Sequence, residues 1–141
     1  MLAIGSDHGG FALKQAVKMH LDSLNIEYCD YGSDSEQSCD YPVYAKKVAS
    51  AIVSGEYDKG ILICGTGIGI SIAANKVPGI RAALCSDSYS AEMTRRHNDA
   101  NVLCMGGRVI GEGLALSIVD VFLSTEFEGG RHLRRVEQLE S

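Results

Sequence analysis

The stretch Gly60-Ile61-Leu62-Ile63-Cys64-Gly65-Thr66-Gly67-Ile68-Gly69-Ile70-Ser71-Ile72-Ala73-Ala74 joins a short apolar run to three alternating glycines and a second apolar segment. The run from Ile61 to Ile63 is typical of a strand that is buried on both faces of a parallel sheet. The residues after Gly69 are compatible with a helix. The stretch therefore predicts a buried strand, a glycine-rich turn and the start of a helix.

Such a turn gathers free backbone N–H groups at the positive end of a helix dipole, where an anion can bind. Cys64 stands at the border of this turn, and the same field favours a thiolate over a thiol. A glycine pattern alone is a weak signal, because glycines also allow a strand and a helix to pack closely. The presence of Cys64 and Thr66 makes a functional turn the favoured interpretation.

The rest of the chain alternates strand-like and helix-like segments at short intervals. Apolar runs predict strands near residues 1–5, 26–29, 61–63, 80–85 and 101–105, and helical periodicity predicts helices near 11–24, 42–54, 86–97 and 112–123, with a short basic helix after Gly129-Gly130. This order predicts one α/β domain over residues 1–141. We expect a three-layer α/β/α, Rossmann-like sandwich around a five-stranded, mostly parallel sheet, with an additional C-terminal helix.

Two turns rich in reactive side chains follow predicted strands. Asp7 and His8 come directly after the first strand, and Cys64 to Gly69 come after the third. Ligands of parallel sheets bind at the carboxyl ends of the strands, so the two turns would face one crevice if these strands are neighbours. Asp7 and His8 could also be an ordinary helix cap, which their position alone slightly favours.

Two basic segments each allow a structural and a functional interpretation. The segment from Arg95 to Asn98 ends a predicted helix, where basic residues neutralise the negative end of the dipole; the residues alone favour this role. Arg131 and Arg135 are one helical turn apart in the C-terminal segment. They could belong to a solvated tail or form a phosphate clamp.

Composition excludes several classes of protein. A net charge of −5 argues against nucleic acid or an anionic membrane surface as the main partner. No apolar run reaches the length of a membrane span and no leader pattern is present, so we expect a cytoplasmic protein. The five cysteines are odd in number and lack CxxC spacing, which favours reduced thiols over disulfides or a zinc site. The glycine spacing GxGxG after the third strand disfavours a dinucleotide site.

Taken together, six segments resemble one family, the type B ribose-5-phosphate isomerases, which are grouped with bacterial galactose- and allose-6-phosphate isomerases. They are Ser6-Asp7-His8-Gly9-Gly10, Asp40-Tyr41-Pro42, Cys64-Gly65-Thr66-Gly67-Ile68-Gly69-Ile70-Ser71, Arg96-His97-Asn98-Asp99, Gly107-Arg108-Val109 and Gly129-Gly130-Arg131-His132. The resemblance spans nearly the whole chain, and the combination is far more specific than any single motif.

The resemblance implies an aldose–ketose isomerase that interconverts ribose 5-phosphate and ribulose 5-phosphate through a cis-enediolate, without a metal or another cofactor, in the non-oxidative branch of the pentose phosphate pathway. It implies that Cys64 is the base, that His97 opens the sugar ring with Asp7 nearby, and that Thr66 belongs to the catalytic turn. The substrate contacts it implies are Asp7, His8, Tyr44, Gly65, Thr66, Gly67, Ile68, Gly69, Asn98, Arg108, Arg131 and Arg135.

The resemblance also implies a homodimer with shared active sites, and the dimers could pair into a tetramer. Two other functions stay open. One is isomerisation of a six-carbon sugar phosphate, such as allose or galactose 6-phosphate. The other is a non-catalytic domain that binds a sugar phosphate or a nucleotide.

Overall fold

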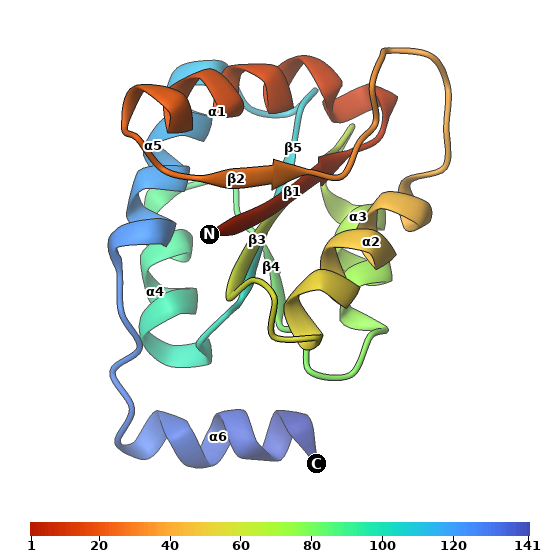
Figure 1. The fold of residues 1–141 in the computed structure, drawn as a ribbon. Helices are drawn as coiled ribbons and strands as arrows, with labels where there is room; N and C mark the ends of the chain where they lie inside the picture. The colour runs from red at the N-terminus through yellow and green to blue at the C-terminus, as the bar shows by residue number, and fades with distance from the viewer.

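Five strands form one sheet at the centre of the computed structural model, which describes all 141 residues (Figure 1). The strand order is β2-β1-β3-β5-β4, and every pairing is parallel. The strands are β1 (Leu2–Ser6), β2 (Tyr28–Asp30), β3 (Lys59–Cys64), β4 (Ala82–Leu84) and β5 (Val102–Gly106). The predicted α/β fold is confirmed, as is the prediction that the first and third strands are neighbours.

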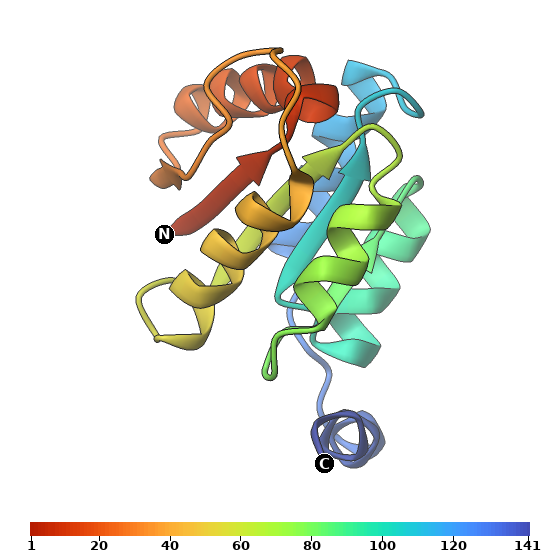
Figure 2. The same ribbon diagram turned by 90° about the vertical axis from the view of Figure 1, so that its right-hand side faces the viewer.

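Helices cover both faces of the sheet, which gives the predicted three layers (Figures 1 and 2). The helices are α1 (Phe11–Ser23), α2 (Tyr41–Val53), α3 (Ile68–Asn75), α4 (Ser88–Asn98), α5 (Glu112–Ser124) and α6 (Arg131–Glu140). Helices α1, α4 and α5 pack on one face, and α2 and α3 on the other. Helix α6 lies apart from both layers, beyond the end of the sheet at which the strands begin.

The side chains of the central strands point alternately to the two faces of the sheet and so contribute to two hydrophobic cores. In β3, Ile61 and Ile63 contribute to the core beneath α1, α4 and α5, whereas Leu62 and Cys64 contribute to the core beneath α2 and α3. Because successive side chains of a strand point to opposite faces, a strand covered on both faces is apolar at every position. This is why the central strands are visible in the sequence as unbroken apolar runs.

The two outer strands differ from their predicted bounds. β4 is limited to Ala82–Leu84 within the predicted range 80–85, and β2 is shifted to Tyr28–Asp30 from the predicted range 26–29. Each outer strand pairs with one neighbour only, so the apolar pattern is weaker and fewer ladder hydrogen bonds define its ends. Pro42 stands in the first turn of α2, where a missing N–H breaks no helical hydrogen bond, and Asp40 is the N-cap residue without a side-chain capping hydrogen bond.

Lys14 is the largest departure from the pattern in α1. The sequence suggests a polar position between apolar ones, yet the side chain is 1% exposed. Its Nζ donates hydrogen bonds to Asp30 Oδ1 at 2.9 Å and to the Ser33 carbonyl at 2.6 Å, while Lys18 Nζ donates to Asp30 Oδ2 at 2.9 Å. The buried ammonium therefore fastens the start of the loop formed by residues 31–40 to α1 and β2.

The Asp30 carboxyl has a pKa below its ordinary value. Burial alone would raise this pKa, but hydrogen bonds from Lys14, the Gly32 N–H and Lys18 outweigh burial. The folded state thus favours the carboxylate, which stabilises the protein at pH values above the pKa of the unfolded chain, about 4. This contribution is lost as the pH falls from there through the lower folded pKa.

We expect Asp30→Asn to lower the free energy of unfolding by about 3 kcal/mol at pH 7, because it leaves the buried Lys14 without its counter-charge. The difference from the wild type should shrink as the pH falls below about 4, where Asp30 is protonated first in the unfolded chain and, at lower pH, in the folded protein as well. Urea unfolding at several pH values measures both effects, with Asp34→Asn, an exposed change in the same loop, as the control. Equal stability of Asp30→Asn and the wild type at pH 7 would contradict this account of the ion pair.

Candidate active site

The turn from Cys64 to Gly69, here called the cysteine turn, connects the end of β3 to the start of α3. Cys64 is buried, and its Sγ accepts a hydrogen bond from the Gly67 N–H at 3.2 Å. Thr66 Oγ1 accepts from the Ile68 N–H at 3.2 Å. The remaining N–H groups of the first turn of α3 have no partner within the helix, so they are available to an anion beside the thiol.

Gly67 is required by the geometry of the cysteine turn, and Gly65 lies beside the Arg108 side chain. Gly67 has a φ of +80°, and a Cβ there would lie 2.5 Å from Leu84 Cδ1 and 2.7 Å from the Met105 carbonyl carbon. A Cβ on Gly65 would lie 3.4 Å from Arg108 Nη1, so the Arg108 side chain passes close to the turn. Gly67 therefore gives the left-handed conformation and the close approach to Leu84 and Met105 that the turn needs.

Asp7 to Gly10, here called the aspartate turn, lies directly against the cysteine turn. Asp7 is 6% exposed, and its Oδ1 accepts hydrogen bonds from the N–H groups of Gly9 at 2.9 Å and Gly10 at 3.2 Å. A Cβ on Gly9 would lie 3.0 Å from the Gly65 nitrogen, which shows how closely the two turns approach. Asp7 is thus a cap, as one interpretation predicted, and the two turns do face each other, as the sheet order required.

His8 is oriented by a residue that the sequence analysis did not select. The Cys39 N–H donates to His8 Nδ1 at 3.2 Å, which leaves Nε2 as the protonated nitrogen of a neutral ring. Hydrogen bonding with Cys39, followed by burial, raises the pKa of Tyr44. In the sequence Cys39 is one of five cysteines expected to be reduced thiols, and its place beside the Asp40-Tyr41-Pro42 segment is the only signal of its position.

His97 and Asn98 lie at the opposite end of the sheet from Cys64. Helix α4 runs back along the sheet from the carboxyl end of β4, so its last residues reach the amino end of the strands (Figure 1). The carbonyl of Asn101, three residues after Asn98, accepts a hydrogen bond from the N–H of Gly60 at 2.9 Å. Gly60 and Cys64 are separated by about 13 Å of strand. His97 therefore cannot act on a molecule held at the cysteine turn of its own chain.

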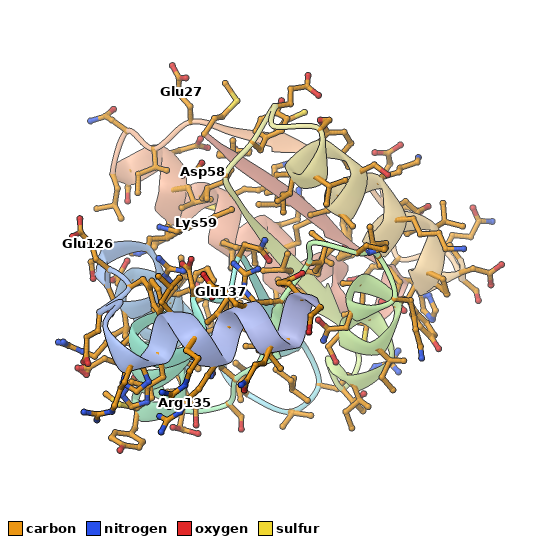
Figure 3. All side chains as sticks on the ribbon, turned by 90° about the horizontal axis from the view of Figure 1, so that it is seen from below. Glu27, Asp58, Lys59, Glu126, Arg135 and Glu137 are labelled. Atoms are coloured by element: carbon orange, nitrogen blue, oxygen red, sulfur yellow. The ribbon has the colours of Figure 1, made fainter.

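Helix α6 packs at this same amino end. The imidazole rings of His97 and His132 are stacked, with centroids 4.2 Å apart and an angle of 15° between the planes. Figure 3, viewed from below, shows Lys59, the first residue of β3, on the side of the molecule that α6 and Arg135 occupy. The basic residues of α6, Arg131 among them, thus lie away from the cysteine turn of the same chain.

One cluster at this end contains possible metal ligands. Nitrogen or oxygen atoms of His97, Glu128 and His132 lie within 4.8 Å of one another. The two rings lie face to face, and Arg96 Nη1, a competing cation, lies 3.7 Å from Glu128 Oε2. Burial lowers the pKa of His132, and His97 and Arg131 lower it further. This arrangement suits a stacked pair of rings better than a cation site.

Comparison with known proteins gives the family of the chain. Residues 2–139 match the family model described as Ribose/Galactose Isomerase. Ribose-5-phosphate isomerase B of Escherichia coli is 54% identical over 138 residues, which are 98% of this chain and 93% of that protein. The chain belongs to the ribose/galactose isomerase family, and it is an enzyme of the sugar-phosphate isomerase class.

Solved structures agree with this assignment. Ribose-5-phosphate isomerase B of Clostridium thermocellum has a TM-score of 0.97 at 56% identity, over 99% of this chain and 94% of that chain. Ribose-5-phosphate isomerase B of Mycoplasma genitalium, solved with bound ribulose-5-phosphate, has a TM-score of 0.93 at 41% identity, over 98% of this chain and 92% of that one. The resemblance to type B ribose-5-phosphate isomerases is thereby confirmed.

None of the helices in the structure has the length and apolarity needed to cross a membrane.

The geometry of the cysteine turn leads to a prediction about Gly67. We expect Gly67→Ala to lower the free energy of unfolding by about 3 kcal/mol, from the left-handed φ and the clash with Leu84 and Met105 together. Gly55→Ala is the matched control, because Gly55 has a φ of +84° with open space around it; it should cost about 1 kcal/mol. Chemical unfolding measures both, and equal losses in the two variants would contradict the packing argument.

Proposed function

We propose that this chain interconverts D-ribose 5-phosphate and D-ribulose 5-phosphate through a cis-enediolate, with Cys64 as the base. The observation that carries the proposal is the buried Cys64 sulfur at a turn of free N–H groups, where it can act on a carbon whose neighbouring oxygen becomes negative. The names of the relatives, and the ribulose-5-phosphate bound in the Mycoplasma genitalium protein, support the same substrate pair.

The proton transfer needs few groups. The Cys64 thiolate takes the proton from C2 of the open aldose, and the electrons pass to the C1 oxygen. The N–H groups of Gly65 to Gly69 stabilise the resulting enediolate oxygen, with Thr66 fixing the turn. The C2 hydroxyl then gives up its proton and the C1 oxygen gains one, and the proton on Cys64 returns to C1 as the C2 carbonyl forms, which gives the ketose. Since one proton moves between adjacent carbons, the reaction requires neither a redox cofactor nor a metal.

Ring opening comes before this step for the cyclic aldose. The bond between C1 and the ring oxygen breaks, the ring oxygen receives a proton, and the C1 hydroxyl loses one as the carbonyl forms. We assign the protonation of the ring oxygen to His97. We assign the acceptance of the hydroxyl proton to Asp7 Oδ2, the oxygen that does not cap the aspartate turn.

The phosphate needs donors on both sides of the crevice. His8, with its proton on Nε2, and Arg108, which passes close to Gly65, are candidates on the chain that supplies Cys64. Arg131 and Arg135, one turn apart on α6, suit a phosphate by charge and geometry. Tyr44 and Asn98 complete the proposed contacts with the sugar.

His97, Asn98, Arg131 and Arg135 lie too far from the cysteine turn of their own chain, so we propose that a second copy supplies them in a homodimer with two shared sites. A two-fold axis would bring the amino end of one sheet to the carboxyl end of the other in both directions. Exposed apolar side chains around the cysteine turn support burial by a partner: Ile68 is 52% exposed, Ile72 55% and Leu84 42%. Dimers could pair further into tetramers.

We also propose that the reaction takes place in the cytoplasm, in the non-oxidative branch of the pentose phosphate pathway. A six-carbon substrate, such as allose or galactose 6-phosphate, is the alternative within the family. Faster turnover of either hexose phosphate than of ribose 5-phosphate by the purified protein would replace the substrate in this proposal. Binding of ribose 5-phosphate without turnover would contradict ribose 5-phosphate as the substrate.

Incorporation of deuterium from D₂O into C1 of ribulose 5-phosphate separates the two chemical steps, because it requires the enediolate but not ring closure. We expect Cys64→Ala to lose both this exchange and net conversion to ribose 5-phosphate by about 10³-fold or more. His97→Asn should lose net conversion while it keeps most of the exchange. Proton NMR measures both, with Cys29→Ala as the thiol control. Substantial exchange by Cys64→Ala would remove this thiol from the role of base.

A further inference from the structure

The imidazole of His97 stacks on the imidazole of His132. The His97 ring forms no hydrogen bond within the chain. Its face lies on the His132 ring, with the two ring centroids 4.2 Å apart. A group that must deliver a proton to one atom needs a fixed ring plane, because the direction of the N–H bond decides the transfer. His132 is the residue in position to fix that plane.

His132 is itself firmly placed. It is 5% exposed, and Val136, one helical turn further along α6, is 7% exposed, so these two side chains form the buried face of the helix. His132 Nε2 has no hydrogen-bond partner, and the nearest carboxylate oxygen, Glu128 Oε1, is 3.6 Å away. Burying a nitrogen without a hydrogen-bond partner is unfavourable. The favourable contact of the His132 ring at this position is therefore its stack on His97.

Charges around the pair indicate which ring carries a proton. Arg96, Arg131 and Arg135 are close by, and Glu128 is the one carboxylate facing His132. The excess of positive charge disfavours two adjacent imidazolium ions, and the buried ring is the less favourable site for a charge. His132 can therefore stay neutral beneath His97 while His97 gains and gives up its proton.

We propose that His132 is a positioning residue for ring opening: its buried, neutral imidazole holds the plane of His97 and thereby aims a His97 nitrogen at the ring oxygen of the sugar bound at the partner's cysteine turn. This rests on the proposed function, in which His97 protonates that oxygen. His132 does not touch the substrate and takes no proton in the reaction.

His132→Leu removes the stack and keeps α6 anchored by an apolar side chain. We expect net conversion of ribose 5-phosphate to fall about 10-fold at saturating substrate, while deuterium exchange at C1 of ribulose 5-phosphate stays within about twofold of the wild type. His132→Phe restores an aromatic face, and conversion should return to within about threefold of the wild type. If His132→Leu does not fold, His132→Asn, which also lacks an aromatic ring, is measured instead.

Val136→Ala is the matched control, because it loosens the same face of α6 without touching the stack. If His132 only anchors α6, its substitution should act like Val136→Ala: both assays fall together, and the KM rises because Arg131 and Arg135 are displaced. That pattern, or unchanged conversion in His132→Leu, overturns the positioning role. If His97→Asn itself loses conversion and exchange equally, the ring-opening role of His97 is wrong, and the role of His132 is overturned with it.

Discussion

The direction of α4 relative to the sheet is the constraint on which the site depends. In a parallel sheet with short connections, each helix must run back along the strands before the next strand can begin. Cys64 ends a strand and His97 ends a helix, so this connectivity puts them at opposite ends of the sheet. No local adjustment of side chains can close a gap of about 13 Å or more. A site that uses both residues therefore requires a second chain.

The contact between the aspartate turn and the cysteine turn follows from the strand order. β1 and β3 are adjacent at the centre of the sheet, so the aspartate turn and the cysteine turn end side by side. The two turns approach so closely that glycine is favoured at position 9, because a Cβ on Gly9 would lie only 3.0 Å from the Gly65 nitrogen. The ion pair of Lys14 with Asp30 then holds the loop that brings Cys39 to His8.

Patterns of neighbouring residues predicted the features of the fold that depend on neighbouring residues. The apolar run from Ile61 to Ile63, the glycines after it and the alternation of strands and helices were sufficient for the fold and for the two facing turns. The burial of Lys14 was missed because its partners, Asp30 and Ser33, are distant in sequence and give no periodic signal. The bounds of the outer strands were missed because pairing on one side alone leaves a weak pattern.

The amino end of the sheet could not be predicted from the sequence. The joint at Gly129-Gly130 leaves the direction of α6 open, and the basic residues around His97 are equally typical of an ordinary helix end. The stack of His97 on His132 joins residues 35 positions apart, and it became visible only in the structure. In the proposed site, which two chains would share, the partner of His97 lies outside its own chain, so no local pattern in the sequence indicates the role proposed for it.

The shared site is tested most directly by mixing two inactive variants, Cys64→Ala and His97→Asn, under conditions in which subunits exchange. In a mixed dimer, Cys64 of one chain would meet His97 of the other in one site, and both lesions would fall in the second site. Because about half of the dimers are mixed and each has one intact site, net conversion of ribose 5-phosphate should recover to about a quarter of the wild-type rate. Native mass spectrometry verifies that mixed dimers have formed. If they have formed and conversion stays at the level of the separate variants, the two residues do not act across the interface, and the account of a shared site is wrong.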